Sequence, residues 1–304
     1  MNLDTVLDRL VVPGYTRIGY GLRSRGWPAD DPAPGSLTGK TAVVTGARSG
    51  LGKATAAGLA RLGATVRLLV RDAERAASTL ADLRREVPSA EFVVDECDIS
   101  DLDAVRRYAA GLIDPVHALI HNAGVMPPRR TESAQGHELT LATHVLGPLL
   151  LTELLKHQLS RVVFVSSGGM YTQPLPTDPE YREAPYKPAV AYARSKRVQV
   201  ALTPLLAAEL TPVFVGAMHP GWSETPGLAE SLPGFSRLTR PFLRTAEEGA
   251  DTTVWLAATE SRPATGKFWH DRQIRPAHYL GSTRESDAAR QQMWNYCRTA
   301  CGIS

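Results

Sequence analysis

Residues 41–62, TAVVTGARSGLGKATAAGLARL, decide the fold of this 304-residue chain. Residues 41–45 form an apolar run typical of a buried strand, and residues 53–62 form a helix-like stretch. Between them lies a turn with three glycines, a sequence that lets backbone N–H groups approach a pyrophosphate at the positive end of the helix. Three residues separate the first two glycines, where the commonest dinucleotide-binding turn has one. The strand, turn and helix nevertheless predict a dinucleotide-binding unit.

The alternation of strand and helix continues along the chain. Helical stretches separate further strand-like runs, which cover residues 65–70, 91–94, 118–120, 162–165, 213–218 and 267–270. This pattern predicts the α/β class, with a Rossmann-type doubly wound parallel sheet in a single domain. We expect that domain to cover residues 39–275. An N-terminal extension and linker (1–38), dense in Pro, Gly and Asp at 26–37, precedes it, and a C-terminal tail (276–304) with a helix at 285–297 follows.

Composition and charge exclude several classes of protein. Apolar residues make up 43% and charged residues 21% of the chain, which argues against disorder and against a membrane-spanning protein. A formal net charge of +3 without a basic tract argues against nucleic-acid binding. The three cysteines match neither a disulfide framework nor a metal cluster, so we expect no metal and a reducing compartment. The first residues lack the features of a secretory signal, and we expect a cytoplasmic protein.

The N-terminal segment carries one short apolar face. Its apolar residues recur at helical spacing until Pro13 and Gly14 stop the pattern; they are Leu3, Val6, Leu7, Leu10 and Val11. We expect this face to dock on the body of the protein or on a second subunit. Peripheral attachment to a membrane is the alternative interpretation.

Tyr192 and Lys196 stand four residues apart, a spacing that places both side chains on one face of a helix, roughly 5–6 Å apart. A phenol with an ordinary pKa of about 10 needs about 4 kcal/mol of preferential phenolate stabilisation to titrate near neutral pH. A fixed neighbouring ammonium is the simplest source of that stabilisation. Most such pairs are only a packed ring beside a lysine in solvent, so the rest of the chain decides their meaning.

Six motifs follow one another in order along the chain. They are the turn at 45–52, CDI at 97–99, HNAG at 121–124, SSGG at 166–169, Tyr192 with Lys196, and HPGWSET at 219–225. Together they resemble the classical short-chain dehydrogenase/reductases over about residues 39–270. Three stretches, SSGGM at 166–170, MHPGWSETP at 218–226 and FWHDR at 268–272, are similar to the group named dehydrogenase/reductase SDR family member 12. Members of that group also carry an N-terminal extension.

The resemblance implies an oxidoreductase that transfers hydride between a nicotinamide and a carbonyl or alcohol. It assigns the proton transfer to Tyr192, hydrogen bonding of the carbonyl oxygen to Ser167, and binding of the nicotinamide ribose to Lys196. Ser166 is the second choice for the serine. The resemblance also implies a cofactor site made of Thr45, Gly46, Ser49, Gly50, Leu51, Gly52, Asp98, Ile99, Asn122, Ala123, Gly124, Tyr192, Lys196, Pro220, Gly221, Trp222 and Thr225.

The residue at the tip of the second strand usually selects the nicotinamide cofactor. An acidic residue there binds the adenine ribose hydroxyls, whereas an arginine pairs with a 2′-phosphate. Arg71 occupies this tip, and Arg48 in the glycine turn offers a second cation. Asp72 follows directly, and both arginines also suit a solvated surface. We therefore expect NADP(H), with NAD(H) as the alternative.

One position departs from the family pattern. The family has an asparagine in the helix after the fourth strand, where it holds a water that links the lysine to solvent, but here His144 stands at that position. A histidine with its ordinary pKa of about 6.5 is able to carry a proton in such a relay. The alternative is a packed helix residue without a relay role.

The segments around the expected site predict its substrate and its assembly. The stretch between Ser167 and Tyr192 is apolar enough to form a pocket wall; its apolar residues are Met170, Tyr171, Leu175, Tyr181 and Tyr186. The residues after the Pro-Gly turn suit a movable lid; they are Trp222, Pro226, Leu228, Leu232 and Phe235. We therefore expect a hydrophobic small-molecule carbonyl or alcohol. The helix after Tyr192 continues with apolar Val198, Ala201, Leu202 and Leu205, which suits either a homo-oligomer interface or packing on the sheet.

Two other functions stay open at this point. A cofactor-binding protein with little catalysis would retain the fold, with His144 marking a lost proton relay. A nucleotide-sugar epimerase shares the architecture, although the chain after Thr225 is short for its usual substrate domain.

Overall fold

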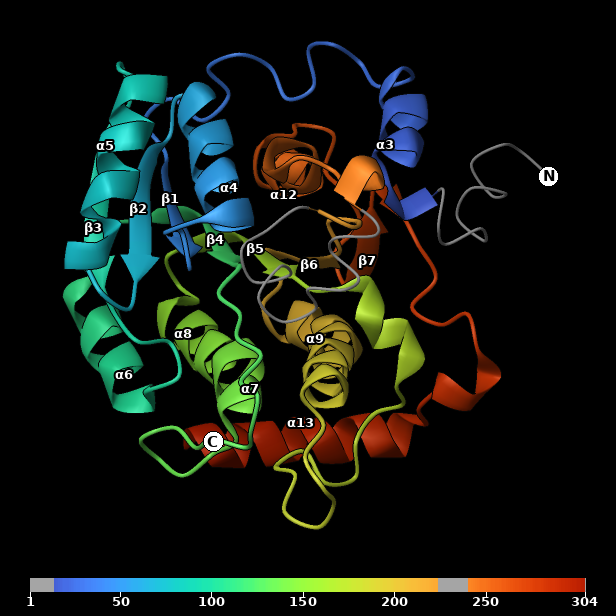
Figure 1. Cartoon of the computed structure of the whole chain (residues 1–304). Helices are drawn as coiled ribbons and strands as arrows, with labels where there is room; N and C mark the ends of the chain where they lie inside the picture. The colour runs from blue at the N-terminus through green and yellow to red at the C-terminus, as the bar shows by residue number, and fades with distance from the viewer. Residues whose placement is uncertain (1–13, 224–239, 304) are drawn as a thin grey trace.

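The computed structural model describes residues 14–223 and 240–303. The strands in these ranges form one sheet in the order β3-β2-β1-β4-β5-β6-β7-β8 (Figure 1). Strands β1 to β7 pair in parallel, and β8 pairs antiparallel with β7. The strands are β1 (Thr41–Thr45), β2 (Thr65–Val70), β3 (Phe92–Glu96), β4 (Val116–His121), β5 (Leu159–Val165), β6 (Phe214–Met218), β7 (Lys267–His270) and β8 (Gln273–Ile274).

Helices cover both faces of the sheet (Figure 1). One face carries α4 (Gly50–Arg61), α5 (Ala77–Glu86) and α12 (Ala246–Ala258), and the other carries α6 (Leu102–Gly111), α8 (Gly147–Leu155) and α9 (Pro188–Glu209). The described ranges also contain α3 (Arg17–Ser24), α7 (Leu139–Leu141) and α13 (Asp287–Cys301), the last of which packs across α8 and α9. Short 3₁₀ turns cover Glu74–Ala76, Gly168–Thr172, Arg240–Phe242 and Gly281–Thr283, and a π-helical turn covers Ala142–Leu146.

Successive strand residues point to opposite faces, so each strand feeds two apolar cores. In β1, Val43 belongs to the core under α6, α8 and α9, whereas Val44 belongs to the core under α4 and α12. Both valines are fully buried. This two-sided burial is the physical reason for the continuous apolar runs that identified the parallel strands in the sequence.

The expected α/β architecture is confirmed, with a doubly wound and mostly parallel sheet. Strands β1, β2 and β7 have the predicted bounds, while β4 and β5 begin two and three residues earlier than their apolar runs indicated. The two-residue strand β8 was not predicted, because Gln273 and Ile274 are too few to make a pattern. Since parallel strands carry their carboxyl ends at one edge, the loops after β1, β2, β4, β5 and β6 meet there.

The segments at both ends of the chain pack on the same body. The predicted linker is fastened, because Leu37 is fully buried and the Trp255 indole Nε1 donates to Asp31 Oδ2 at 2.8 Å. The tail supplies α13, whose Met293, Trp294, Cys297 and Cys301 are buried. The predicted apolar face of residues 3–11 lies outside the described residues. Within the described ranges, no helix has both the length and the apolar character needed to cross a bilayer.

Candidate active site

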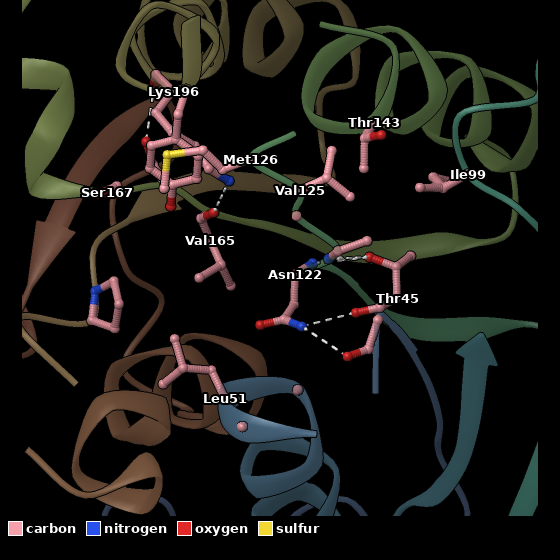
Figure 2. A pocket seen from close by; sticks show the side chains of 18 of the residues that line it. Thr45, Leu51, Ile99, Asn122, Val125, Met126, Thr143, Val165, Ser167 and Lys196 are labelled. Atoms are coloured by element: carbon pink, nitrogen blue, oxygen red, sulfur yellow. Dashed lines mark hydrogen bonds between the residues drawn. The ribbon is translucent and has the colours of Figure 1, made fainter. Parts of the chain in front are cut away.

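A cavity of about 790 Å³ opens at the carboxyl ends of the parallel strands. It extends from Arg71 after β2 to Trp222 after β6, and Figure 2 shows the residues around its centre. The residues predicted from the sequence line it, with two exceptions; those present are Thr45, Gly46, Arg48, Ser49, Gly50, Leu51, Gly52, Arg71, Asp98, Ile99, Asn122, Ala123, Gly124, Ser167, Tyr192, Lys196, Pro220, Gly221 and Trp222. His144 is not part of this lining, and Thr225 lies outside the described residues.

The glycine turn between β1 and α4 is packed so tightly that no side chain fits at Gly46 or Gly52. A Cβ atom on Gly52 would lie 2.4 Å from the Gly46 carbonyl oxygen and 2.5 Å from Asn122 Nδ2. Gly46 has a φ of +66°, which L side chains rarely adopt. The turn therefore leads directly into the N-terminus of α4, whose free backbone N–H groups suit a phosphate. A bare cradle of this kind fits the pyrophosphate of a dinucleotide.

Asn122 fastens this turn to the end of β4 (Figure 2). Its Nδ2 donates to the carbonyl oxygens of Thr45 at 3.0 Å and of Gly46 at 3.3 Å. The Thr45 hydroxyl oxygen in turn accepts the backbone N–H groups of Asn122 and Ala123, both at 2.9 Å. Neighbouring strand ends are thereby held in register, which keeps the floor of the cavity rigid.

The end of the cavity next to β2 carries the charged residues that bear on the choice between NADP(H) and NAD(H). Arg48 and Arg71 are exposed at its rim. Asp72 is already engaged, because its carboxylate accepts the backbone N–H of Arg75 at 2.9 Å and pairs with the Arg75 guanidinium at 3.2 Å. Asp98 accepts the backbone N–H of Ser100 at 2.9 Å and its hydroxyl at 2.7 Å. Asp72, which complicated the sequence interpretation, is thus paired with a neighbouring arginine.

Ser167, Tyr192 and Lys196 come together at the other end, from the end of β5 and the first turns of α9. Contrary to the expectation that Lys196 would lower it, the pKa of Tyr192 is raised by burial, and a hydrogen bond with the Ser167 side chain acts in the opposite direction. Lys196 Nζ donates to the Val165 carbonyl oxygen at 2.8 Å (Figure 2) and lies 5.6 Å from the centroid of the Tyr192 ring. Burial lowers the pKa of Lys196 to about 7.

The neighbouring Ser166 has a different environment. It is buried, and its hydroxyl donates to the Lys196 carbonyl oxygen at 3.0 Å. The Ser167 Oγ instead accepts the backbone N–H of Gly169 at 3.2 Å, which leaves its hydroxyl proton free to reach Tyr192 or a ligand. This geometry favours Ser167 over Ser166 as the serine that contacts a substrate.

His144 sits in the π-helical turn Ala142–Leu146, and protein partners engage both of its ring nitrogens. Nε2 accepts the backbone N–H of Val125 at 2.9 Å, so the proton of the neutral ring is on Nδ1 and is donated to Ser195 Oγ at 2.7 Å. Burial and the charge of Lys196 hold the pKa of His144 well below its usual value. Its carbonyl oxygen accepts Gln199 Nε2 at 2.7 Å. The ring ties the loop after β4 to α9 rather than facing the cavity.

The predicted pocket wall after Ser167 has an unexpected composition. The cavity is lined by the small residues at the start of this stretch, Gly168, Gly169 and Thr172. The large side chains of Met170, Tyr171 and Tyr181 are instead buried in the protein core. The predicted lid residues Pro226, Leu228, Leu232 and Phe235 lie outside the described residues.

The apolar stripe on α9 is mostly covered within the chain itself. Val198, Ala201 and Leu202 are already buried, and only Leu205 is half-buried. This favours packing on the sheet over an exposed oligomer face, and homo-oligomerisation stays a prediction.

The sequence did not predict that Tyr15 contacts the cavity. Tyr15 lines the same cavity although it precedes the dinucleotide-binding unit. It lies far along the chain from Gly168 and Trp222, so no local spacing announces the contact.

Comparison with known proteins identifies the relatives of the chain. Residues 40–234 match the short chain dehydrogenase family. Dehydrogenase/reductase SDR family member 12 from Bos taurus is 36% identical over 290 residues, which cover 92% of this chain and 91% of the relative. Retinol dehydrogenase 12 from Homo sapiens is 34% identical over 280 residues, which cover 88% of each.

Solved structures agree with these relatives. An uncharacterized protein from Mycobacterium paratuberculosis superposes with a TM-score of 0.74 at 30% identity, over 92% of this chain and 98% of that one. A candidate NAD(P) dependent gluconate 5-dehydrogenase from Beutenbergia cavernae, with NADP bound at low occupancy, gives a TM-score of 0.62 at 26% identity, over 78% and 96% of the two chains.

Proposed function

Because this chain belongs to the short-chain dehydrogenases and is an oxidoreductase acting on CH–OH or C=O groups, we propose that it is an NADP(H)-dependent enzyme for a hydrophobic carbonyl or alcohol, with Tyr192 as general acid and base. The observation that carries this proposal is the convergence of Ser167, Tyr192 and Lys196 at one end of a cavity whose other end is a glycine cradle with two arginines. The residues fit a nicotinamide dinucleotide at both ends.

In the reductive direction Tyr192 donates its phenolic proton to the oxygen of the substrate carbonyl. The cofactor supplies the hydride when it is bound. The raised pKa of Tyr192 keeps the phenol protonated at neutral pH, which is the form that reduction requires. The Ser167 hydroxyl holds the same carbonyl oxygen, since it lies next to the phenol. General acid catalysis of this kind contributes typically about 10²–10⁴ in rate.

Lys196 binds the ribose hydroxyls beside the nicotinamide and sets the charge next to Tyr192. Its Nζ is directed at the Val165 carbonyl oxygen, so the ammonium is held at the floor of the site, where a sugar hydroxyl is able to accept from it. A pKa of about 7 means that small changes in the surroundings decide whether the group is charged.

The engaged ring of His144 supports a structural role over a proton relay. Both nitrogens already have partners, and a cation would lose the hydrogen bond from Val125. We therefore propose that His144 positions α9, and with it Tyr192, whose ring lies 5.3 Å from the imidazole centroid. Loss of the family asparagine does not by itself indicate a lost enzyme.

The apolar part of the cavity lining supports an apolar substrate. Val125, Met126, Leu139 and Trp222 belong to that lining. The relative named retinol dehydrogenase acts, by its name, on an apolar alcohol. We propose a substrate of the same general character, a carbonyl attached to a hydrophobic group.

The catalytic assignment is tested with Tyr192→Phe on a panel of lipophilic aldehydes, ketones and alcohols, followed by nicotinamide absorbance. We expect the loss of one hydroxyl to lower kcat by about 10² or more while NADPH affinity is retained. Tyr186→Phe is the matched control, because its hydroxyl bonds to Thr140 and Glu138 outside the cavity. Wild-type protein that binds NADPH tightly yet leaves the absorbance unchanged on every substrate would favour a binding protein without catalysis.

The cofactor preference is tested with Arg71→Asp. The new carboxylate repels a 2′-phosphate and accepts ribose hydroxyls, so the ratio of NADPH to NADH affinity should fall by about 10²-fold or more. Arg84→Asp, an exposed arginine on α5 that does not line the cavity, makes the same change in net charge. An equal effect of the two variants would mean that Arg71 does not contact the phosphate.

A further inference from the structure

The N-terminal extension reaches into the wall of the cavity through Tyr15. This side chain is almost fully buried, and its ring lies edge-on to His219, with 4.4 Å between the centroids. A Cβ on Gly168 would lie 3.3 Å from Tyr15 Cε2, so the ring is stacked against the residue that directly follows Ser167. The Trp222 ring lies 6.4 Å away, also edge-on. Tyr15 thus stands between the catalytic serine and the Pro-Gly turn.

Backbone contacts hold the segment around Tyr15 in this position. Its carbonyl oxygen accepts the backbone N–H of Trp222 at 2.8 Å. A Cβ on Gly221, which has a φ of +78°, would lie 2.7 Å from the same oxygen and 2.5 Å from Arg244 Nε. The glycine of the Pro-Gly turn therefore serves a second purpose here, because it allows the extension to approach.

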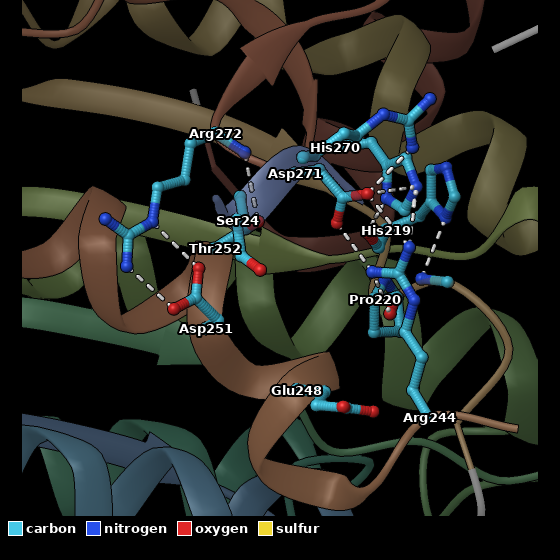
Figure 3. A network of polar contacts seen from close by, with 12 residues as sticks. Ser24, His219, Pro220, Arg244, Glu248, Asp251, Thr252, His270, Asp271 and Arg272 are labelled. Carbon is cyan, nitrogen blue, oxygen red and sulfur yellow. Dashed lines mark hydrogen bonds and ion pairs between the residues drawn. The ribbon is translucent and has the colours of Figure 1, made fainter. Parts of the chain in front are cut away.

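A buried cluster of ion pairs, which includes Arg244 and Asp271 (Figure 3), holds the segment 14–16 in place. The Asp271 carboxylate accepts Arg244 Nη1 at 2.6 Å and Arg23 Nη1 at 2.8 Å, and all three side chains are nearly inaccessible. The same two arginines donate to the Gly14 carbonyl oxygen, at 3.1 Å from Arg244 and 2.9 Å from Arg23. Arg244 Nε also donates to the Thr16 carbonyl oxygen at 3.2 Å. The backbone on both sides of Tyr15 is thereby fixed.

The backbone of the β7–β8 turn has an unfavourable conformation at the two residues that hold the N-terminal extension. Asp271 and Arg272 have φ values of 50° and 56°, in a two-residue turn where Asn-Gly is the common choice. Arg272 places its guanidinium 4.3 Å from the centroid of the Trp27 ring and donates to the Asp31 carbonyl oxygen at 2.5 Å. Both side chains of the turn therefore clamp the extension, which explains why non-glycine residues occupy it.

From this geometry we propose that the N-terminal extension is a wall of the substrate pocket, in which Tyr15 limits the width of the apolar group next to the reacting carbonyl. Asp271 is a positioning residue, since it acts on the substrate only through the segment that carries Tyr15. The proposal rests on the carbonyl reductase function proposed above. It adds a specificity residue from outside the dinucleotide-binding domain.

The test compares slim straight-chain aldehydes with bulky ring-bearing aldehydes as substrates of the full-length protein with NADPH. Removal of the ring in Tyr15→Ala should raise kcat/KM for bulky over slim substrates by about tenfold or more, mainly through KM. Tyr296→Ala is the matched control, because this tyrosine lies on α13, donates its hydroxyl to Glu180 and does not line the cavity. An unchanged bulky-to-slim ratio in folded Tyr15→Ala would overturn the proposal. Should Tyr15→Ala not fold, Tyr15→Leu must shift the ratio in the same direction.

A second readout needs no turnover. The dissociation constants of the matching slim and bulky alcohols are measured by calorimetry in the presence of NADP⁺. If wild-type protein shows no turnover but Tyr15→Ala improves bulky alcohol binding relative to slim, the proposed function fails and the pocket wall stands. If turnover is normal and neither ratio changes, the wall fails and the function stands.

The positioning role of Asp271 is tested with Asp271→Asn, which should shift the bulky-to-slim ratio in the same direction by a smaller factor. In the Tyr15→Ala background it should add nothing, because the residue through which it acts is gone. A further shift of the ratio in the double variant would show that Asp271 does not act through Tyr15.

Discussion

Two replacements of His144 separate a structural role from a proton relay: asparagine, the residue that the family pattern has at this position, tests the hydrogen bonds, and leucine removes every relay group. The imidazole makes two hydrogen bonds, from the Val125 backbone N–H at 2.9 Å and to Ser195 Oγ at 2.7 Å. The shorter amide is able to replace only one of them at unchanged backbone geometry. One lost bond with its partner left unsatisfied, together with lost packing of a fully buried ring, should lower the free energy of unfolding by about 2–4 kcal/mol.

The effect on catalysis should be smaller than a lost relay would give. We expect kcat of His144→Leu, whose side chain can neither carry a proton nor hold a relay water, to fall by less than about tenfold, whereas removal of a proton-transfer group costs about 10²–10⁴. His121→Asn is the matched control, since this buried histidine has one hydrogen bond, from Nε2 to Thr152 at 2.7 Å, and does not line the cavity. Urea unfolding gives the stabilities, and steady-state kinetics with a lipophilic aldehyde gives kcat.

The pH dependence of the stability difference adds a second criterion. The pKa of His144 in the folded protein lies well below the usual value because of burial and the charge of Lys196. Below about pH 6.5 the unfolded chain therefore binds a proton on His144 that the folded protein does not bind. The stabilisation that the neutral, buried His144 gives to the folded state is complete above about pH 6.5 and declines as the pH falls below that value. Between about pH 7.5 and pH 5.5 wild-type protein should lose about 1.4 kcal/mol more than the variant. A difference that is independent of pH, or a 100-fold loss of kcat at unchanged stability, would refute the structural role.

Three further predictions concern the surroundings of the site. Gly221→Ala should cost at least about 2 kcal/mol more than Gly39→Ala in urea unfolding, because both glycines have positive φ but only Gly221 has crowded neighbours. NADPH affinity, measured by fluorescence, should fall up to about tenfold between about pH 6 and pH 8. The reason is that Lys196, with its pKa of about 7, loses its positive charge over this range. The affinity of Lys196→Met should not show this fall. Arg197→Lys should lower the unfolding free energy by about 2–3 kcal/mol, since one ammonium cannot reproduce the three hydrogen bonds of the guanidinium to the carbonyl oxygens of Met170, Gln173 and Ala277. A Tm within a degree or two of wild type would contradict that role for Arg197.

The cofactor-binding half of the molecule was predictable because its signals are local. The apolar runs of β1 and β2, the glycine turn and the start of α4 lie within about thirty residues of each other, and each depends on backbone geometry that its own sequence imposes. Strand ends were less predictable. Leu159 joins β5 only because β4 pairs with it, at Val116.

The sequence by itself determined the class of the fold, the cradle and the set of residues that converge on the cavity, because periodicity and glycine requirements act over short distances. Only the tertiary structure decided that both ring nitrogens of His144 are engaged, that Ser166 donates its hydroxyl to the Lys196 carbonyl oxygen while Ser167 does not, and that Asp72 pairs with Arg75. It also brought Tyr15 beside Gly168 and Gly14 beside Asp271. These contacts join positions more than a hundred residues apart, and they form only when the completed sheet places its strand ends at one edge.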